Sequence, residues 1–353
     1  MAMSKPVICI VGAGYVGLPL AVAFSKYFQT VVYTHSQTHV QELKNGIDRT
    51  ENFTAEELEV CDMLITSDLD SIRSANVYIV TVPTPVNEKM QPDLSAITSA
   101  THAVGSVLNK GDIVVYESTV YIGCTEELCV PILQEESGLI YNDGFFCGFS
   151  PERINPADRE HTIKTVVKIV SGSTAKITEI LASLYGTIVE AGIHKAPSIK
   201  VAEASKLLEN IQRDVNIALM NELSSVYKEM GIVTSDVIDA ASTKWNFNPY
   251  RPGLVGGHCI GVDPYYLIYN AHEKGLKVPI VEQARSTNNA MAEQIVDETE
   301  RLMEMNNRKL KGSSALLLGV TFKENCSDIR NSQSALIYDR LCSKGAKVDA
   351  VDP

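Results

Sequence analysis

One cysteine of this chain lies in a setting that suits a reactive thiol. The stretch GGHCIGVDPYY, residues 256–266, places Cys259 just after two glycines and four residues before Asp263. Glycines remove side-chain bulk, so a substrate, a cofactor or another chain segment can approach the sulfur closely. The stretch by itself fits either a nucleophilic cysteine or a small hydrophobic residue buried in a glycine-rich turn.

A glycine motif near the N-terminus predicts a dinucleotide-binding site. GAGYVG, residues 12–17, follows the apolar strand PVICIV and opens a segment with helical periodicity. In this context the glycines let a pyrophosphate approach the backbone at a helix N-terminus. The second strand, TVVYT, ends at Thr34, and His35 follows where an acidic residue usually binds the ribose of NAD. Because no carboxylate repels a 2′-phosphate and no arginine attracts one, we expect NAD as the cofactor, with NADP tolerated.

Polar side chains also share one face of a long predicted helix. The segment from residue 198 to about 230 contains no Gly or Pro, and its apolar residues recur at spacings of three and four. Glu203, Lys206, Asn210 and Arg213 fall on one face of this helix. A solvated face is the ordinary explanation of such a stripe, and a catalytic face is the alternative. A helix of this length can join domains or pair across a dimer.

The first half of the chain predicts a doubly wound α/β domain. Strands are expected at residues 6–11, 30–34, 77–85 and 112–120, with helices between them. This alternation implies right-handed crossovers, a parallel sheet and a ligand crevice outside the carboxyl ends of the strands. Residues 81–85 and 117–119 would border the crevice.

The remaining segments predict two further domains. Another helix is expected from about residue 281 to 306, and a new alternation of strand and helix runs from ALLLGVTF to the last residue. We expect a Rossmann-like NAD(P)-binding domain over 1–197, a central helical dimerisation domain over 198–306, and the start of a second Rossmann-like domain over 307–353. We expect the third domain to be incomplete, because two strands cannot bury both faces of a doubly wound sheet.

Composition argues against several classes of protein. The 353 residues carry a formal net charge of −12, which disfavours a nucleic-acid groove. We expect no membrane segment and no signal peptide, because no apolar run is long enough and no basic leader precedes the first strand. The eight cysteines lack paired C-x-x-C spacing, so we expect reduced thiols, no metal site and a cytoplasmic protein. An anionic substrate would then be held by locally placed cations.

Seven motifs occur in the order seen in one known family. They are GxGYVGLPLA, TVPTP, ESTV, SPERxxP, ExxKxxxN, GGHCxxVDP and GxTFKENxxDxR. The chain resembles the nucleotide-sugar 6-dehydrogenases from Val7 to its end, and GGHCIGVDPYYL is most similar to the enzymes that act on UDP-N-acetylhexosamines for bacterial surface polysaccharides. The resemblance implies four-electron oxidation of the sugar C6 alcohol to a carboxylate, with two NAD reduced and a thiohemiacetal and a thioester formed on Cys259.

The resemblance also implies roles for catalytic residues. Lys206 and Asn210 would stabilise the oxyanion, and Glu152 would act as general acid and base in thioester hydrolysis. Asp263 would orient Lys206 or water, and Thr119 would position water beside the nicotinamide.

Cofactor and substrate contacts follow from the motifs and the resemblance together. The expected cofactor contacts are Gly12, Gly14, Tyr15, Val16, Gly17, His35, Thr81, Pro83, Thr84, Thr119 and Arg330. The expected substrate contacts are Arg153, Ile154, Lys206, Asn210, Arg213, Arg251, Gly256 and Lys323. We expect Arg251 to act across the subunit boundary of a homodimer that forms through the long helix.

Three alternatives remain open at this point. UDP-glucose is the alternative substrate of the same chemistry. A two-electron 3-hydroxyacid dehydrogenase would share the nucleotide fold and a catalytic lysine on the long helix but would need no cysteine. A nucleotide-binding or assembly module would bind a nucleotide without any turnover.

Two residues depart from the family pattern. His35 replaces the usual acidic residue, and Ile122 stands where relatives often carry proline.

Overall fold

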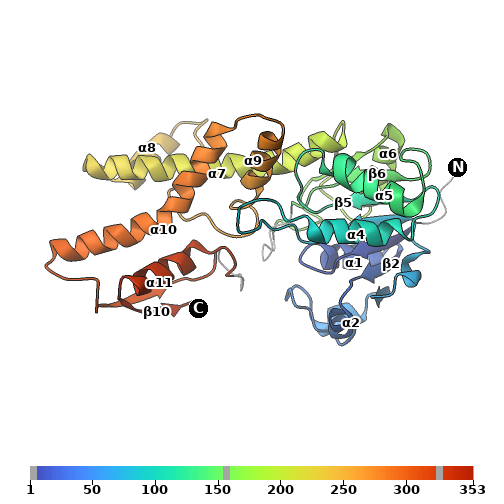
Figure 1. The fold of residues 1–353 in the computed structure, drawn as a ribbon, viewed down its shortest axis with the longest axis horizontal. Helices are drawn as coiled ribbons and strands as arrows, with labels where there is room; N and C mark the ends of the chain where they lie inside the picture. The colour runs from blue at the N-terminus through green and yellow to red at the C-terminus, as the bar shows by residue number, and fades with distance from the viewer. Residues whose placement is uncertain (1–5, 154–159, 323–328, 353) are drawn as a thin grey trace. The chain divides into compact units, whose positions relative to one another are not determined.

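The computed structural model describes residues 6–153, 160–322 and 329–352 (Figure 1). The chain divides into two compact units, Met1–Lys206 and Leu207–Pro353. Among the helices of the described residues, none is both long and apolar enough to cross a lipid bilayer. The predicted domain boundaries at 197 and 306 remain predictions.

The first unit is built on one eight-stranded sheet with the order β3-β2-β1-β4-β5-β6-β7-β8. The strands are β1 (Val7–Val11), β2 (Gln29–Tyr33), β3 (Met63–Thr66), β4 (Val77–Val80), β5 (Ile113–Tyr116), β6 (Phe146–Phe149), β7 (Lys168–Gly172) and β8 (Ile193–Lys195). Neighbouring strands are parallel except for β6 and β7, which are antiparallel. This arrangement places the ends of β1, β4 and β5 side by side.

Helices cover both faces of this sheet. They are α1 (Gly17–Ser25), α2 (Gln37–Lys44), α3 (Ala55–Glu59), α4 (Ser95–Gly105), α5 (Val130–Ser137) and α6 (Ala175–Tyr185), with short turns η1 (Asp70–Ile72) and η2 (Thr125–Cys129). Alternate residues of β1 enter the two cores: Ile8 and Ile10 pack with α1 and α6, whereas Cys9 and Val11 pack with α4 and α5. The apolar run of β1 is therefore buried on both sides, as a central parallel strand requires.

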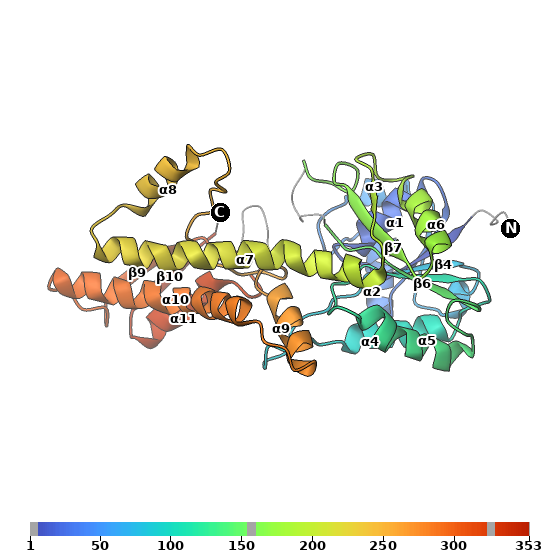
Figure 2. The same ribbon diagram turned by 90° about the horizontal axis from the view of Figure 1, so that it is seen from above.

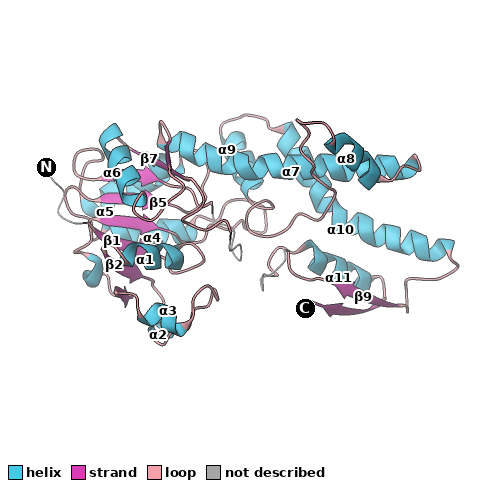
Figure 3. Ribbon diagram, turned by 180° about the vertical axis from the view of Figure 1, so that it is seen from behind, coloured by secondary structure: helices cyan, strands magenta, loops and turns pink. Residues whose placement is uncertain are grey.

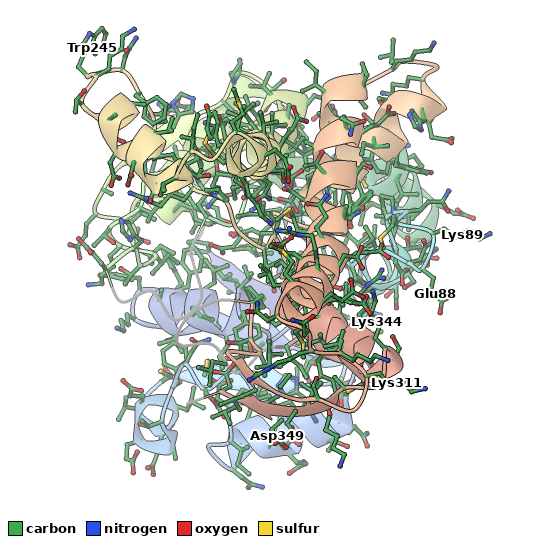
Figure 4. All side chains as sticks on the ribbon, turned by 90° about the vertical axis from the view of Figure 1, so that its left-hand side faces the viewer. Glu88, Lys89, Trp245, Lys311, Lys344 and Asp349 are labelled. Carbon is green, nitrogen blue, oxygen red and sulfur yellow. The ribbon has the colours of Figure 1, made fainter. Side chains whose placement is uncertain are left out.

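The second unit contains most of α7 (Ile199–Glu229), whose 31 residues span roughly 46 Å (Figure 2). The other elements are α8 (Thr234–Ser242), α9 (Asp263–Glu273), α10 (Pro279–Met305), β9 (Ser314–Leu318), α11 (Gln333–Ser343) and β10 (Lys347–Val351). Strands β9 and β10 form a parallel pair beside α11 (Figure 3). Lys344 joins α11 to α10 through ion pairs with Asp297 and Glu300 at 2.9 and 2.5 Å (Figure 4).

The structure confirms the predicted α/β class and both long helices to within two residues at each end. The predicted parallel sheet is confirmed, with one exception: β7 runs antiparallel to β6. Antiparallel neighbours need no helical crossover, and the described part of the connection between β6 and β7 contains no helix. Strands β3, β6, β7 and β8 were not predicted from the sequence.

Candidate active site

The glycine turn between β1 and α1 has the shape that a dinucleotide requires. Gly12 has a φ of +104°, and a side chain on Gly17 would place its Cβ 1.9 Å from the Gly12 carbonyl oxygen. Both glycines are therefore needed by the fold itself. A Cβ on Gly14 would meet nothing within 4 Å, so the backbone faces open space there. That space fits a pyrophosphate at the start of α1, where Tyr15 and Val16 are half-buried.

Hydrogen bonds bring the three neighbouring strand ends together. The Thr81 hydroxyl donates to the Gly12 carbonyl at 2.9 Å, which ties the end of β4 to the glycine turn. The Thr84 hydroxyl donates to the Thr119 carbonyl at 2.7 Å, which ties the loops after β4 and β5. Pro83 is exposed between them. These predicted cofactor contacts thus gather at one edge of the sheet.

The end of β2 is polar and carries no carboxylate. Thr34 is buried, and His35 is exposed directly after it. Ser36 caps α2 by accepting a hydrogen bond from the His39 backbone N–H at 3.2 Å. A cavity of about 580 Å³ is lined by α2 and by Thr66 and Ser67, and Lys44 forms part of its wall. The sequence analysis considered arginine at this place and missed this lysine.

The loop after β6 carries Glu152 and Arg153. Both side chains are half-buried, and the Arg153 guanidinium donates to the Val167 carbonyl at 2.7 Å. Ile154, a predicted substrate contact, lies outside the described residues.

The polar stripe on α7 is largely buried, which makes the solvated-face interpretation wrong. Glu203, Lys206 and Asn210 are 0%, 8% and 1% exposed. The Glu203 carboxylate accepts hydrogen bonds from the backbone N–H groups of Gly123 and Thr125 at 2.6 and 3.0 Å. Lys206 and Asn210 lie one helical turn apart beyond this anchor.

In the second unit, Asn210 lies at the centre of a polar chain. Its amide nitrogen donates to the carboxylate of Asp263, the buried first residue of α9. Its amide oxygen accepts from the guanidinium of Arg213. Asp263 was predicted to orient Lys206 or water, and its contact with Asn210 was not predicted from the sequence.

The Cys259 turn is shaped by residues more than sixty positions later in the chain. Gly257 has a φ of +81°, and a Cβ there would lie 2.6 Å from the Phe322 ring. A Cβ on Gly256 would lie 2.6 Å from the Asn331 carbonyl oxygen. The glycine pair therefore lets the segment after β9 pack against the turn. The role of Gly256 in binding substrate remains a prediction.

Cys259 differs from the core thiols in its surroundings. Burial raises the pKa of Cys9 and Cys147 well above the usual thiol range, which makes these two groups inert. Cys259 is exposed, and its carbonyl accepts the backbone N–H of Asp263 at 2.9 Å, so the turn leads directly into α9. The interpretation of Cys259 as a buried hydrophobic residue is wrong.

The remaining predicted cations lie on the second unit. Arg251 is exposed and pairs with Asp239 at 2.6 Å. Arg330 is exposed near the start of α11. Lys323 lies outside the described residues.

A buried group beside the site was missed by the sequence analysis. The Glu117 carboxylate accepts hydrogen bonds from both Lys168 and Tyr185 at the edge of the sheet. A lysine inside the apolar run VVKIV was the available signal, because such a residue must find a partner when its strand is buried.

Comparison with known proteins agrees with this arrangement. Residues 6–189, 200–290 and 316–353 match the NAD binding, central and UDP binding domains of the UDP-glucose/GDP-mannose dehydrogenase family. The chain is 50% identical to UDP-N-acetyl-D-glucosamine 6-dehydrogenase of Pseudomonas aeruginosa, over 98% of this chain and 82% of that protein. It is 46% identical to Protein CapL of Staphylococcus aureus, over 98% of this chain and 81% of that one.

Solved structures agree as well. A UDP-D-ManNAc dehydrogenase from Pyrococcus horikoshii superposes with a TM-score of 0.91 at 29% identity, over 98% of this chain and 83% of that chain. The chain belongs to the UDP-glucose/GDP-mannose dehydrogenase family and is an NAD-dependent nucleotide-sugar dehydrogenase.

Proposed function

We propose that this chain oxidises the C6 alcohol of a UDP-N-acetylhexosamine to a carboxylate. The observation that carries the substrate is the 50% identity, over 98% of the chain, with a relative named UDP-N-acetyl-D-glucosamine 6-dehydrogenase. The product is an acidic sugar nucleotide, and we place its use in the synthesis of capsule or O-antigen polysaccharide. A cytoplasmic location, expected from the sequence, fits a reaction that consumes NAD.

Cys259 supplies the chemistry that a two-electron dehydrogenase lacks. Removal of a hydride from C6 and of the hydroxyl proton leaves an aldehyde, and the Cys259 thiolate adds to its carbon to form a C–S bond. The oxygen takes up a proton, which gives a thiohemiacetal. Loss of a second hydride and of that proton gives a thioester, and water then releases the carboxylate, the thiolate and two protons. NAD held by the glycine turn of Gly12, Gly14 and Gly17 would supply the hydride acceptor for both oxidations.

Residues of α7 and α9 are proposed to stabilise the charge on oxygen. Lys206 offers a buried ammonium, and Asn210 offers an amide N–H one turn further on. One N–H of the Asn210 amide binds Asp263, which fixes the plane of the amide and leaves the second N–H to the oxyanion. The role of Asp263 in this proposal is therefore to orient Asn210.

The other predicted residues complete the proposal. Glu152 takes a proton from the water that attacks the thioester, and Thr119 positions water beside the nicotinamide. Arg153, Arg213 and Arg251 supply cations for the diphosphate, as a protein with a net charge of −12 needs at such a site.

We also infer a homodimer that forms through α7. Three apolar side chains of this helix, Leu208, Leu219 and Val226, and that of Met230 directly after it are 47% to 66% exposed. Their spacings of eleven, seven and four residues place them on one stripe of the helix. A second copy of the helix would cover this stripe, and Arg251 would then reach the neighbouring subunit.

The proposed function is tested by the number of NADH molecules formed per molecule of sugar oxidised. The protein is incubated with UDP-GlcNAc, UDP-GalNAc, UDP-ManNAc and UDP-glucose in turn, and NADH formed is divided by sugar consumed. We expect two NADH per molecule of an N-acetylated sugar and a carboxylate in the product by mass spectrometry. A ratio of one supports the hydroxyacid class, binding without NADH supports the nonenzymatic class, and a clear preference for UDP-glucose supports the alternative substrate.

Two serine variants separate the role of the nucleophile from general loss of a thiol. Cys259→Ser is expected to bring acid formation below detection while nucleotide binding persists. Cys342→Ser removes another exposed thiol and is expected to turn over like the wild type. Acid formation by Cys259→Ser at the wild-type rate would refute the covalent mechanism.

A further inference from the structure

A buried ion pair contacts the loop that carries Glu152. Lys168 Nζ lies 2.5 Å from Glu117 Oε2 and 3.1 Å from the Pro151 carbonyl oxygen. The Tyr185 hydroxyl donates to Glu117 Oε1 at 2.5 Å, and Lys168 Nζ lies 5.5 Å from the centre of the Tyr185 ring. The side chains of Lys168 and Glu117 are 7% and 0% exposed, so both charges are shielded from water.

The antiparallel strand explains why these residues meet. Because β7 runs against β6, its first residue, Lys168, lies at the edge where β5 and β6 end. The register pairs Phe149 with Ser171, and its continuation by three residues sets Lys168 opposite Glu152. Tyr185 ends α6, the helix that joins the parallel strands β7 and β8, and so returns to the same edge.

The carboxylate of Glu152 lies close enough to this group to act on its charges. Burial raises the pKa of Glu117 and of Tyr185, and the nearby carboxylate of Glu152 raises both further. Arg153 adds a further charge to this turn and donates to the Val167 carbonyl.

A role in stability alone does not account well for such a group. Desolvation of two buried charges offsets most of their attraction, so a buried pair contributes little net stability compared with apolar residues. The pair instead fixes the position of the backbone just before Glu152. The ammonium holds the carbonyl of Pro151, one residue before Glu152.

We propose that Lys168 and Glu117 are positioning residues for Glu152. Lys168 holds the Pro151 carbonyl and thereby the turn that presents Glu152. Glu117, fixed by Tyr185, neutralises the ammonium and keeps Lys168 on the Pro151 carbonyl instead of on the Glu152 carboxylate. This inference rests on the proposed function, which assigns Glu152 to thioester hydrolysis.

Glu117→Gln tests the neutralising role. The change leaves Lys168 charged beside Glu152, which then becomes its partner and a weaker base. The pH at which thioester hydrolysis reaches half its maximal rate is expected to fall by about one unit, and the maximal rate by about tenfold. The measurement is the decay of the acyl-enzyme on Cys259 after a single turnover, followed by intact-protein mass spectrometry across pH. The first hydride transfer, followed by NADH absorbance, is expected to stay unchanged.

The double variant Glu117→Gln/Lys168→Met keeps the proposal testable if Glu117→Gln does not fold. It removes both charges of the pair, so no buried charge is left without a counter-ion. We expect its pH midpoint to match the wild type and its maximal rate to stay low, because the hold on Pro151 is lost. The matched control is Glu179→Gln/Lys195→Met, which removes an exposed pair between α6 and β8 at 2.8 Å and is expected to change neither quantity.

The outcomes separate the inference from the function on which it rests. A folded Glu117→Gln protein with the wild-type midpoint overturns the inference. If that variant does not fold, a double variant with the wild-type maximal rate overturns it instead. A wild-type protein that forms no acyl-enzyme on Cys259 overturns the proposed function.

Discussion

His35 holds the position from which a carboxylate would select the ribose of NAD. Its exposed imidazole neither repels a 2′-phosphate as an aspartate would nor binds the ribose hydroxyls as a charged acceptor. Lys44 lines the cavity beside the same strand end and adds a cation there. These residues explain why NADP tolerance is expected of an NAD-dependent enzyme, and that tolerance stays a prediction.

His35→Asp is expected to restore selection for NAD. The ratio of kcat/KM for NAD to that for NADP should rise about tenfold, because the carboxylate binds the ribose and repels the phosphate. Saturation curves for both cofactors provide the measurement. His194→Asp, at another exposed histidine, is the control and is expected to leave the ratio unchanged. A wild-type preference for NAD of about a hundredfold would contradict the predicted tolerance of NADP.

At the scale of elements, Glu203 joins α7 to the turn η2. Its carboxylate accepts from two backbone N–H groups and from the Thr125 hydroxyl at 2.7 Å, so it acts as the cap of a turn eighty residues earlier. Burial raises the pKa of Glu203, and these hydrogen bonds lower it in part. The anchor lies one turn before Lys206 and therefore fixes the part of α7 that carries the proposed oxyanion group.

Glu203→Ala is expected to destabilise the protein by about 3 kcal/mol, because it leaves two buried backbone donors without acceptors. The melting temperature should fall by roughly 5–10 °C in calorimetry. Glu203→Gln keeps one acceptor oxygen and should lose less. Glu222→Ala changes an exposed position of the same helix and should stay within about 0.5 kcal/mol of the wild type. Equal melting temperatures for Glu203→Ala and Glu222→Ala would contradict the capping role.

The same elements show what the sequence could predict and where prediction stops. Helix α7 and the turn between β1 and α1 were predictable, because a long apolar periodicity and a glycine motif act through neighbouring residues. The burial of Glu203 was not predictable, because a polar stripe has the same sequence pattern whether it faces water or a distant loop. The contacts of Gly257 and Lys168 could not be predicted from the sequence either. Phe322 and Glu117 lie far away in sequence, and the antiparallel direction of β7 follows from a connection whose described residues form no helix.

At the scale of the whole molecule, the exposed stripe of α7 predicts self-association. An apolar face on a helix of 31 residues is seldom left in water, and a specific interface usually buries about 1,200–2,000 Å². We expect a homodimer of twice 38.6 kDa by light scattering after gel filtration. Arg251 would reach the neighbouring active site in such a dimer, so turnover should depend on association.

Leu219→Lys/Val226→Lys places two charges in the middle of this stripe and is expected to give a monomer with little turnover, because buried unpaired charges are costly. Ile140→Lys alters an apolar side chain of the first unit that is 67% exposed and should leave both mass and activity unchanged. In the wild type, mass and turnover measured over a dilution series should fall together, whereas the double variant should keep the monomer mass throughout. A double variant that keeps the dimer mass would place the interface elsewhere, whereas an active monomer would refute the action of Arg251 across the boundary.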